Sequence, residues 1–354
     1  MSEHIHLGEI ASAASGARRV DGIPFPLSRR TDPVSVRPGT RAIVRYLLTD
    51  GEHAGKATDV IGVIRSVDPL VIDSAQRTQL TLDPNTVVVL KTLSAAPVRN
   101  SDIRAVEAAT AAAFPGIQNT MIGHWLARAG DGITERSNSA VPIGPNAGVQ
   151  PVPLEEITAF YQEHNLPTIL LLPDRIGRTA ESLPGDRGPE IIVMTRELDD
   201  LDDVAPELEL FARSTLDLRL DDHPTPEWLS MYHFRGKPLP EKALRLLTEK
   251  IDGQMCFASL YLGGHLAAIT RGTITEGGSR NWLGFSAVEV AEGYRRRGLA
   301  SAMGAAMLTW GAKHGAHAAY LDVIASNIAG RALYHRLGFS EHHRHRSLTV
   351  HPGK

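Results

Sequence analysis

The spacing of hydrophobic residues changes near the C-terminal end of the chain. Residues 282–290 form a short run of apolar and β-favouring side chains, which is typical of a buried strand. After Gly293 the apolar positions take the spacing of an α-helix, at Leu299, Met303, Met307 and Trp310. The pattern therefore predicts a strand that turns directly into a helix.

A second strand and helix are predicted just downstream. Residues 317–324 have a strand pattern, and Ser326 and Asn327 are residues that favour the N-cap of a helix. The helical pattern continues to Gly338, and glycine commonly ends helices. Asn327 and Tyr334 are seven residues apart. Because this spacing is about two helical turns, we expect both side chains on one face.

The first turn of the upstream helix has the features of an anion site. Backbone N–H groups at a helix N-terminus have no intrahelical acceptor and lie at the positive end of the helix dipole. Glycine and alanine let a ligand approach closely, and arginine adds charge-assisted hydrogen bonds. A solvated basic turn would have the same residues, but the second strand and helix favour a binding site. The residues concerned are Arg295, Arg296, Arg297, Gly298, Leu299 and Ala300.

These segments carry a family resemblance. Residues 290–300 resemble the acetyl-CoA motif of the GCN5-related N-acetyltransferases, in which Arg or Gln is followed by two residues, Gly, one residue, and Gly or Ala. Residues 321–339 resemble the next motif of that family, with Asn327, Tyr334 and a Gly-Phe pair in order. The proline that is usual after the strand is Glu292 here, which affects only the stiffness of a turn.

The resemblance implies an α+β fold, with a mixed, mostly antiparallel sheet flanked by helices. It also implies transfer of the acetyl group of acetyl-CoA to a primary amine. The backbone of Val288 and Val290 would lie beside the acetyl and pantetheine groups, and Tyr334 would act as the general acid that protonates the leaving thiolate. The residues that the resemblance places against acetyl-CoA are Val288, Val290, Arg295, Arg296, Arg297, Gly298, Leu299, Ala300, Ser301 and Asn327.

The attacking amine also needs a base, because an ammonium group must lose a proton before it can attack a thioester. Two carboxylates on the predicted strands are candidates. Asp322 stands where several family members have a catalytic Glu, and Glu289 lies in the strand that would carry the acetyl group. Each could instead be a strand-end carboxylate in a local salt bridge without a catalytic role. Tyr334 therefore ranks above both as a catalytic residue.

The sequence predicts a separate small β-module near the N-terminus. Residues 32–95 contain short strand patterns separated by turn residues, and they resemble an SH3-like barrel. Tyr46 is the only aromatic residue in the module, so we expect a contact between domains or in a homo-oligomer rather than peptide or nucleic-acid binding. Residues 1–31 are expected to be partly disordered. The strand patterns are at residues 42–47, 59–64, 70–72, 79–82 and 87–90.

The region between the module and the motifs is less informative. Residues 102–114 and 154–164 have helical patterns, and residues 168–172 and 190–194 resemble strands. This order repeats part of the later acetyltransferase pattern, without an Arg-x-x-Gly-x-Ala segment. We therefore interpret residues 96–215 as a degenerate acetyltransferase-like half without a cofactor site. Residues 216–354 would then be the catalytic domain.

The acceptor stays open between alternatives. A small barrel, an acetyltransferase-like half and a C-terminal acetyltransferase together resemble an actinobacterial family, whose members are assigned as N-acetylglutamate synthases of arginine biosynthesis or as histone-type acetyltransferases. L-Glutamate would need cations for two carboxylates, whereas a protein lysine would suit an acidic groove such as residues 199–207. A non-catalytic acyl-CoA sensor is the third alternative. The residues predicted to bind a carboxylate-bearing acceptor are Arg128, Arg136, Asn138 and Arg271.

Composition limits the class of protein. A net charge of −3 over 354 residues gives no basic surface for nucleic acid or for an anionic membrane. The single cysteine, Cys256, excludes an intrachain disulfide and fits a reducing cytosol. No stretch approaches the roughly 18 apolar residues of a transmembrane helix. We therefore expect a soluble, cytoplasmic enzyme with no nucleic-acid or membrane partner.

A group of histidines near the C-terminus invites comparison with a metal site. Alternation places His343 and His345 on one face of a predicted strand, with His342 and His351 nearby. No carboxylate or thiolate accompanies them with the spacing of a metal motif. We therefore expect a solvated edge strand and no metal.

Overall fold

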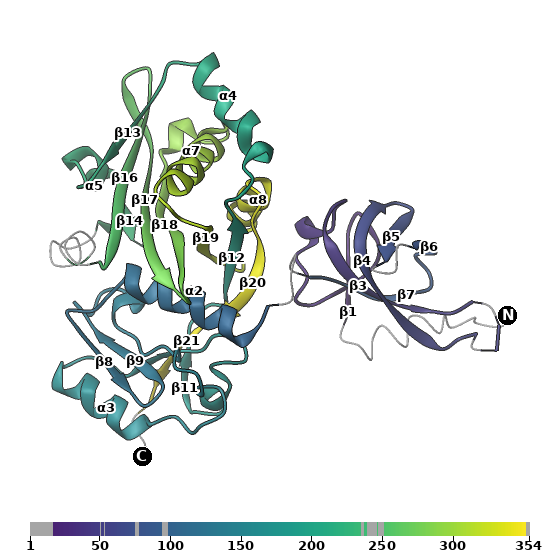
Figure 1. Ribbon diagram of the computed structural model, residues 1–354, viewed down its shortest axis with the longest axis horizontal. Helices are drawn as coiled ribbons and strands as arrows, with labels where there is room; N and C mark the ends of the chain where they lie inside the picture. The colour runs from purple at the N-terminus through teal and green to yellow at the C-terminus, as the bar shows by residue number, and fades with distance from the viewer. Residues whose placement is uncertain are drawn as a thin grey trace. The chain divides into compact units, whose positions relative to one another are not determined.

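A small β-unit precedes a larger α+β unit in the computed structural model, and the two divide between Pro97 and Val98 (Figure 1). The structure describes residues 17–49, 51–52, 54–74, 78–93, 98–234, 237–238, 246 and 251–351. Among these residues, no helix combines the length and apolar character needed to cross a membrane.

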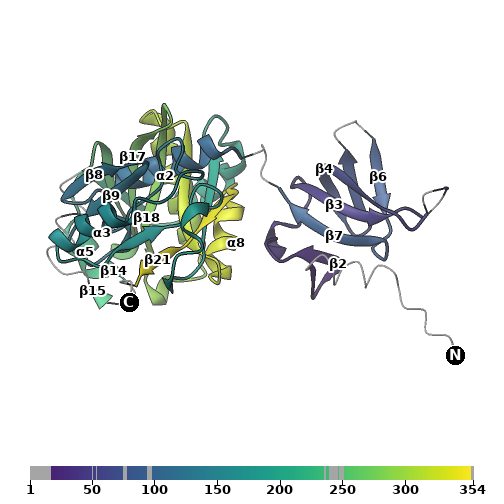
Figure 2. The same cartoon turned by 90° about the horizontal axis from the view of Figure 1, so that it is seen from below.

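The N-terminal unit is a seven-stranded sheet in the order β1-β2-β7-β3-β4-β5-β6, with β3, β4 and β7 side by side (Figure 2). The strand patterns predicted from the sequence correspond to β3 through β7. The strands are β1 (Ala17–Val20), β2 (Ile23–Ser28), β3 (Arg41–Leu47), β4 (Ala57–Val67), β5 (Leu70–Ser74), β6 (Gln79–Leu82) and β7 (Val87–Thr92).

The folded part of this unit begins earlier than residue 32, where the sequence placed its start. Strands β1 and β2 lie in the segment that was expected to be partly disordered. Phe25 and Leu27 of β2 are fully buried in the core of the unit. Pro24 and Pro26 obscured this strand, because proline within a run lowers the expectation of a strand. The expectation is therefore wrong for residues 17–31; residues 1–16 lie outside the described part of the chain.

The larger unit is built on a second seven-stranded sheet, in the order β13-β16-β17-β18-β19-β12-β20. Neighbouring strands are antiparallel except β18 and β19, which are parallel. The mixed, mostly antiparallel sheet expected from the sequence is therefore confirmed. Its strands are β12 (Ile191–Glu197), β13 (Leu216–Asp221), β16 (Gly253–Leu262), β17 (His265–Gly277), β18 (Arg280–Val290), β19 (Ala318–Ile324) and β20 (Ser340–His345).

Helices cover both faces of this sheet. Leu283 and Leu321 point into one core with α7, whereas their neighbours Trp282 and Tyr320 pack with α2 in another. Because side chains alternate across a strand, α7 and α2 lie on opposite faces. The helices are α2 (Asn100–Ala113), α3 (Leu154–Glu163), α4 (Ala205–Arg213), α5 (Pro226–Met231), α7 (Leu299–Lys313) and α8 (Ile328–Arg336).

The boundary predicted at residue 215 does not separate two domains. Strand β12 comes from the region interpreted as a degenerate half, yet it lies between β19 and β20 in the central sheet. Conversely, β21 (Ser347–Val350), near the C-terminus, pairs with two strands of the first half, β10 (Ile169–Leu171) and β11 (Gly185–Arg187). Each half thus supplies a strand to the other, and a local strand pattern does not reveal which sheet it joins.

Shorter elements complete the larger unit. Strands β8 and β9 form a hairpin whose Trp125 is buried, and Trp228 of α5 packs against the sheet. The remaining strands are β8 (Gln118–Ile122), β9 (Trp125–Ala129), β14 (His233–Phe234) and β15 (Lys237–Pro238). The 3-10 helices of the larger unit are η2 (Glu135–Ser137), η3 (Arg178–Ala180), η4 (Asp202–Val204) and η5 (Glu292–Tyr294), and η1 (Pro33–Ser35) belongs to the N-terminal unit.

Candidate active site

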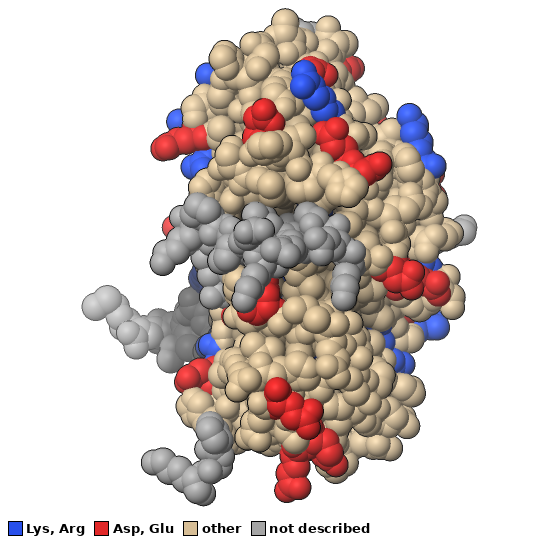
Figure 3. Space-filling view, turned by 90° about the vertical axis from the view of Figure 1, so that its left-hand side faces the viewer, with Lys and Arg blue, Asp and Glu red and all other residues tan. Residues whose placement is uncertain are grey.

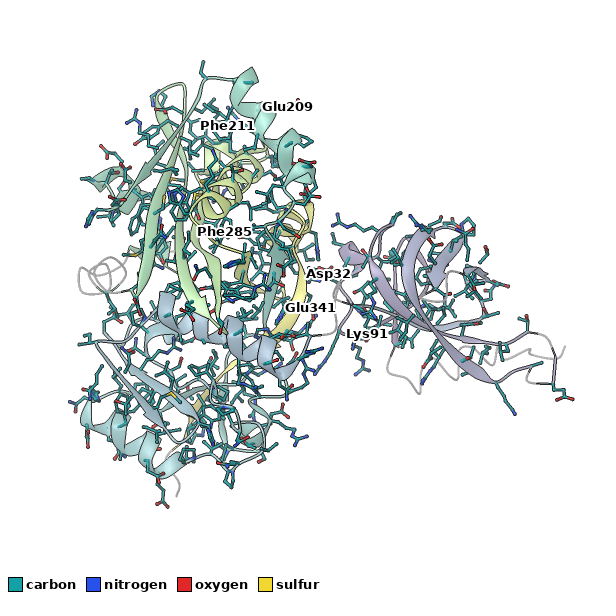
Figure 4. All side chains as sticks on the ribbon, viewed as in Figure 1. Asp32, Lys91, Glu209, Phe211, Phe285 and Glu341 are labelled. Carbon is teal, nitrogen blue, oxygen red and sulfur yellow. The ribbon has the colours of Figure 1, made fainter. Side chains whose placement is uncertain are left out.

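A cavity begins where the two parallel strands separate. Strands β18 and β19 are paired from Trp282 to Phe285, which is labelled in Figure 4, and not beyond it. The next residues of both strands, 286–288 and 322–324, line a cavity of about 830 Å³. Past Phe285, β18 has backbone groups on this side that pair with no neighbouring strand of the described chain. They can therefore bond an extended ligand that contains amides.

A bulge in β18 lies at the wall of this cavity. The register against β17 shifts between Ile269 and Arg271, so that β18 has one extra residue there. Ala287 takes up the irregularity with φ 52°, in the left-handed region. Bulges re-aim neighbouring groups and often lie beside active sites. Here the bulge lies directly before Val288, whose backbone the sequence assigned to the acetyl group.

The turn before α7 has the shape expected of an anion site. Arg296 and Gly298 both have left-handed backbones, with φ 61° and 77°. Gly298 is the N-cap, and the first hydrogen bond of the helix runs from Ala302 N to Gly298 O. The backbone N–H groups of the preceding helical residues, including Leu299, therefore have no intrahelical acceptor. An arginine in this left-handed conformation is uncommon.

The arginines of this turn differ in their contacts. Arg295 donates from Nε to the carbonyl of Val290, 3.1 Å away. The guanidinium of Arg297 lies over the ring of Tyr294, 5.4 Å from its centroid. Arg296 is exposed to solvent. Arg295 thus fixes the turn to the end of β18, and Arg296 and Arg297 remain at the surface where an anion would approach.

Tyr334 and Asn327 come together at the cavity, as the sequence predicted. Burial raises the pKa of Tyr334 to about 12, against a lowering effect of Arg136, so its hydroxyl stays protonated near neutral pH. Asn327 caps α8, because its Oδ1 accepts a hydrogen bond of 2.9 Å from Gly330 N. The side-chain oxygen of Asn327, a residue predicted to contact acetyl-CoA, is therefore already bonded to the helix.

Asp322 and Arg136 face each other in the cavity. The Nε of Arg136 lies 3.7 Å from Oδ2 of Asp322, and both residues line the cavity wall. The other oxygen, Oδ1, is buried and has no hydrogen-bond partner in the described part of the chain. Phe114 lies beneath the guanidinium of Arg136, 4.8 Å from it. Residues from separate halves of the larger unit therefore form one side of the cavity.

Glu289, the second candidate base, is held elsewhere. Its carboxylate accepts a hydrogen bond of 3.2 Å from the backbone N–H of His233, and His233 Nδ1 lies 3.6 Å from its other oxygen. His233 lines the cavity, whereas Glu289 is not among the lining residues. Of the two carboxylates, Asp322 is the one that the fold brings beside Tyr334.

Arg128 and Asn138, predicted to bind the acceptor, are occupied by protein hydrogen bonds. Arg128 is buried and donates to the carbonyls of Phe114 and Ser139 and to the Ser139 hydroxyl. Asn138 is buried and binds the backbone of Gly130, Gly132 and Thr134. Arg128 therefore forms part of the cavity wall, and Asn138 holds a loop in place. The segment is explained as a turn that satisfies its own polar groups.

Arg271 lies behind the cavity wall rather than in it. Its side chain is fully buried, donates to the carbonyl of Ala113 at 3.1 Å, and lies over the Phe114 ring at 5.0 Å. Burial lowers the pKa of Arg271 to about 10. Phe114 separates this guanidinium from the space that an acceptor would fill, and no sequence pattern pointed to Phe114.

The histidine group is a buried cluster and not a solvated edge strand. His343 and His345 are buried, and both contact Oε1 of Glu107 on α2, which lies more than 230 residues earlier. Burial alone would raise the pKa of Glu107, but His345 and His343 lower it far below its usual value. The carboxylate is therefore ionised. Sequence spacing missed it because the partner comes from a distant helix.

Charged side chains of both signs are scattered over the face drawn in Figure 3. Among its described residues, neither sign forms a continuous patch on this face.

Comparison with known proteins places the chain in a family. A family model described as "Probable histone acetyltransferase Rv0428c C-terminal" matches residues 100–348, and one described as "Rv0428c N-terminal Sm-like domain" matches residues 36–91. The chain belongs to the Rv0428c family. The family model and the curated relatives are described as acetyltransferases, so the chain is an acyl-CoA-dependent N-acetyltransferase.

Individual relatives agree with membership of the Rv0428c family. The "Probable histone acetyltransferase Rv0428c" of Mycobacterium tuberculosis is 36% identical over 316 residues, which are 88% of this chain and 95% of that protein. The "Uncharacterized N-acetyltransferase YobR" of Bacillus subtilis is 25% identical over 260 residues, 68% of this chain and 97% of that protein. A solved "GCN5-related N-acetyltransferase from Kribbella flavida" shares the fold, with 16% identity, a TM-score of 0.51, and coverage of 73% and 98%.

The family match also changes the description of the N-terminal unit. The sequence suggested an SH3-like barrel, whereas residues 36–91 match the Sm-like domain of the Rv0428c family. Both expectations describe a small curved β-sheet, and short strands separated by turns do not distinguish them.

Proposed function

We propose that this Rv0428c-family enzyme transfers the acetyl group of acetyl-CoA to the primary amine of a basic acceptor, such as a lysine side chain of a protein. The observation that carries the proposal is Asp322. Its Oδ1 is buried without a hydrogen-bond partner among the described residues, and it lines the same cavity as Tyr334. A buried carboxylate oxygen in this position is a strong acceptor for an ammonium group.

Val288 and Asn327 line the cavity, and the turn before α7, which is not part of that lining, offers the anion site that acetyl-CoA would also need. The left-handed turn at Arg296 and Gly298, and the first N–H groups of α7, suit the diphosphate. The edge of β18 at Val288 and Val290, which pairs with no neighbouring strand of the described chain, suits the amides of the pantetheine arm, with the Val290 carbonyl already bonded to Arg295. We propose these contacts for the residues that the sequence assigned, Arg295, Arg296, Arg297, Gly298, Leu299, Ala300 and Ser301, with Asn327 donating from its free amide nitrogen.

The charge of the lining supports a cationic acceptor. More carboxylates than guanidinium groups face the cavity, so an ammonium group is attracted and a carboxylate is repelled. The relative named as a probable histone acetyltransferase agrees with a lysine acceptor. Apart from Glu107, which is paired with His343 and His345, the charged lining residues are Asp131, Glu135, Asp322, Arg128 and Arg136.

L-Glutamate is the second candidate acceptor, and Arg136 is the observation that favours it. The Arg136 side chain is 41% exposed and lies beside Asp322 at the cavity wall. With Arg128 and Asn138 bound to the protein, Arg136 would have to hold the acceptor carboxylates largely alone. An N-acetylglutamate synthase is therefore the less favoured proposal.

The proposed residues divide the proton transfers. Acetyl-CoA, when bound, supplies the acetyl group as an activated thioester. Asp322 would accept a proton from the ammonium group, so that the neutral amine attacks the carbonyl carbon while the carbon–sulfur bond breaks. Tyr334 would donate its hydroxyl proton to the departing sulfur and would regain a proton from the nitrogen, which loses its second proton as the amide forms. Arg136 would hold the Asp322 carboxylate in position through their contact of 3.7 Å.

An acceptor comparison tests the proposal. The full-length enzyme with acetyl-CoA is assayed for thiol release with a lysine-rich peptide, a polyamine and L-glutamate. We expect the highest kcat/KM with the lysine-rich peptide. A higher value with L-glutamate would favour the second candidate. Tight binding of acetyl-CoA without thiol release for any acceptor would instead support a non-catalytic acyl-CoA sensor.

Asp322→Asn tests the assignment of the base. We expect kcat/KM for the amine to fall by about 10²- to 10⁴-fold near neutral pH, with the KM for acetyl-CoA unchanged. The deficit should shrink as the pH rises toward about 10, because the amine then loses its proton to solvent. Asp217→Asn on β13, an exposed carboxylate paired with Arg219, is the matched control. Equal effects in both variants would remove the base role.

A further inference from the structure

The Glu107 cluster is a second organised group of polar side chains in the larger unit. His343 and His345 project from the same face of β20 toward α2, and both place a ring nitrogen 2.8 Å from Oε1 of Glu107. The side chains of all three residues are at most 7% exposed. Their ligand atoms lie within 4.8 Å of one another. The set of two imidazoles and one carboxylate is a common ligand set of transition metals.

One oxygen of the cluster lacks a protein partner. Both imidazoles share Oε1 of Glu107, whereas Oε2 is buried and accepts no hydrogen bond from the described residues. Arg128 lines the same cavity, but its guanidinium donates to Phe114 and Ser139. A buried carboxylate oxygen without a partner is unfavourable, because it has lost its hydrogen bonds to water and gained none. A cation among the three residues would satisfy it.

The surroundings hold the histidines in place. His342 is the extra residue of a bulge in β20, where the register against β12 shifts between Val193 and Met194. Its Nδ1 lies 2.8 Å from Nδ1 of His343, a contact that orients the His343 ring with Nε2 toward Glu107. Second partners of this kind are typical of metal-bound histidines. The bulge and this contact fix the orientation of the His343 ring, which a metal ligand requires.

We infer that Glu107, His343 and His345 form a binding site for a divalent transition-metal ion of the Zn²⁺ type. Imidazole nitrogens favour Zn²⁺, Co²⁺ and Ni²⁺ over Mg²⁺, which prefers oxygen ligands. Metal binding would replace the contacts that the two imidazoles now make with the carboxylate. The ion would clamp α2 to the edge strand β20, two elements far apart in the sequence.

The site would also face the acetyl-transfer cavity. Glu107 and His345 line that cavity together with Tyr334 and Asp322. Three protein ligands leave at least one coordination position of a tetrahedral ion for water or a polar ligand group. The position would lie at the end of the cavity formed by α2 and β20, where a distal polar group of the acceptor could bind. The inference does not depend on the identity of the acceptor.

Metal stoichiometry tests the inference. The untagged full-length chain is stripped with a chelator, dialysed, and exposed separately to Zn²⁺, Co²⁺ and Mg²⁺. We expect about one Zn²⁺ or Co²⁺ per chain by elemental analysis, visible d–d absorption of the Co²⁺ form, and a higher Tm with Zn²⁺. Mg²⁺ should not be retained. A stripped wild-type chain that retains neither Zn²⁺ nor Co²⁺ would overturn the inference without any variant.

Variants assign the ligands. Glu107→Gln and His345→Gln should each lose the bound metal and the Co²⁺ absorption, with circular dichroism confirming that the chain is folded. His351→Gln is the matched control, because His351 contacts Asp186 at 3.0 Å in an exposed pair on the surface. Loss of metal in His351→Gln with retention in folded His345→Gln would move the ion to the surface and refute the assigned site.

Discussion

Single residues in the cavity are tuned by their surroundings. Tyr334 stays protonated because it is buried, and Asp322 stays close to Arg136 while one of its oxygens faces the cavity. These two side chains lie at the parting of β18 and β19, where a thioester and an amine would meet. The cavity therefore contains both a proton donor and a proton acceptor, which amine acetylation requires.

Removal of the Tyr334 hydroxyl should slow the chemical step selectively. In Tyr334→Phe we expect kcat to fall by about 10²- to 10⁴-fold with unchanged affinity for acetyl-CoA. Because burial raises the pKa of Tyr334 to about 12, its ionisation should not lower the wild-type rate until the pH nears that value. Steady-state kinetics and calorimetric titration with acetyl-CoA measure the two quantities.

Tyr261→Phe provides the matched control for this experiment. Tyr261 lies on β16 beneath the guanidinium of Arg219, away from the cavity lining. It should keep the wild-type rate. Full activity in Tyr334→Phe would show that another group, or water, protonates the thiolate.

Elements position these residues through their ends and irregularities. The N-terminus of α7, the bulge in β18 and the cap of α8 all face the region between β18 and β19. The sequence predicted both strands and both helices here, because periodicity and caps are local signals. It did not predict the bulge, which depends on pairing with β17.

Gly298 provides a test at the scale of the element. Alanine at φ 77° is strained by about 1–2 kcal/mol, although its Cβ would meet only Leu210 at an ordinary 3.6 Å. Gly264→Ala, at φ 82° with nothing within 4 Å, introduces the same strain in the turn between β16 and β17. We expect similar losses in urea unfolding but a raised KM for acetyl-CoA only in Gly298→Ala. Equal KM values would argue against the anion site.

The ion pairs that hold the edge strand β20 should stabilise the fold to a degree that depends on pH. Burial alone would raise the pKa of Glu190. Arg344 and Arg346 together lower it by more than burial raises it, so the pKa lies below its usual value. The lowered pKa means that the ion pairs stabilise the fold at neutral pH and that this contribution disappears as the pH falls through the folded-state pKa.

Glu190→Gln measures this contribution. The free energy of unfolding should be lower than in the wild type near neutral pH, and the difference should disappear at an acidic pH below the folded-state pKa, where the carboxylate is protonated. Urea unfolding at both pH values gives the comparison. Asp73→Asn, which removes a carboxylate paired with Arg65 in the N-terminal unit, reports how much a pair outside the larger unit contributes. A Glu190→Gln difference that stays the same at both pH values would contradict a lowered pKa for Glu190.

At the scale of the whole molecule, the two units have separate cores. Phe25 and Leu27 belong to a core made only of N-terminal residues, whereas the cavity is formed entirely within the larger unit. Within the larger unit the opposite holds, because β12 and β21 are exchanged between its halves. We therefore expect the molecule to divide cleanly at residue 97 and nowhere inside the larger unit.

Deletion of residues 1–97 tests this division. The remaining chain should unfold cooperatively and keep the wild-type kcat/KM for a peptide acceptor, because all cavity-lining residues remain. By contrast, truncation before Ser347 should destabilise the fold, since Leu348 is fully buried among residues of the first half. Loss of activity in a folded 98–354 chain would show that the Sm-like unit contributes to catalysis.

The sequence by itself determined the reaction class, through its family resemblance, and it predicted which residues would hold the acetyl donor. Strand, arginine-glycine turn and capped helix are contiguous in the chain, so periodicity and spacing reveal them directly. Tertiary structure decided the acceptor side, where Phe114, Arg136 and Asp322 meet from distant segments. It also bound Arg128 and Asn138 to the protein and placed Glu107 between two histidines. Such contacts depend on which sheet a strand joins and on long-range packing, which local patterns do not encode.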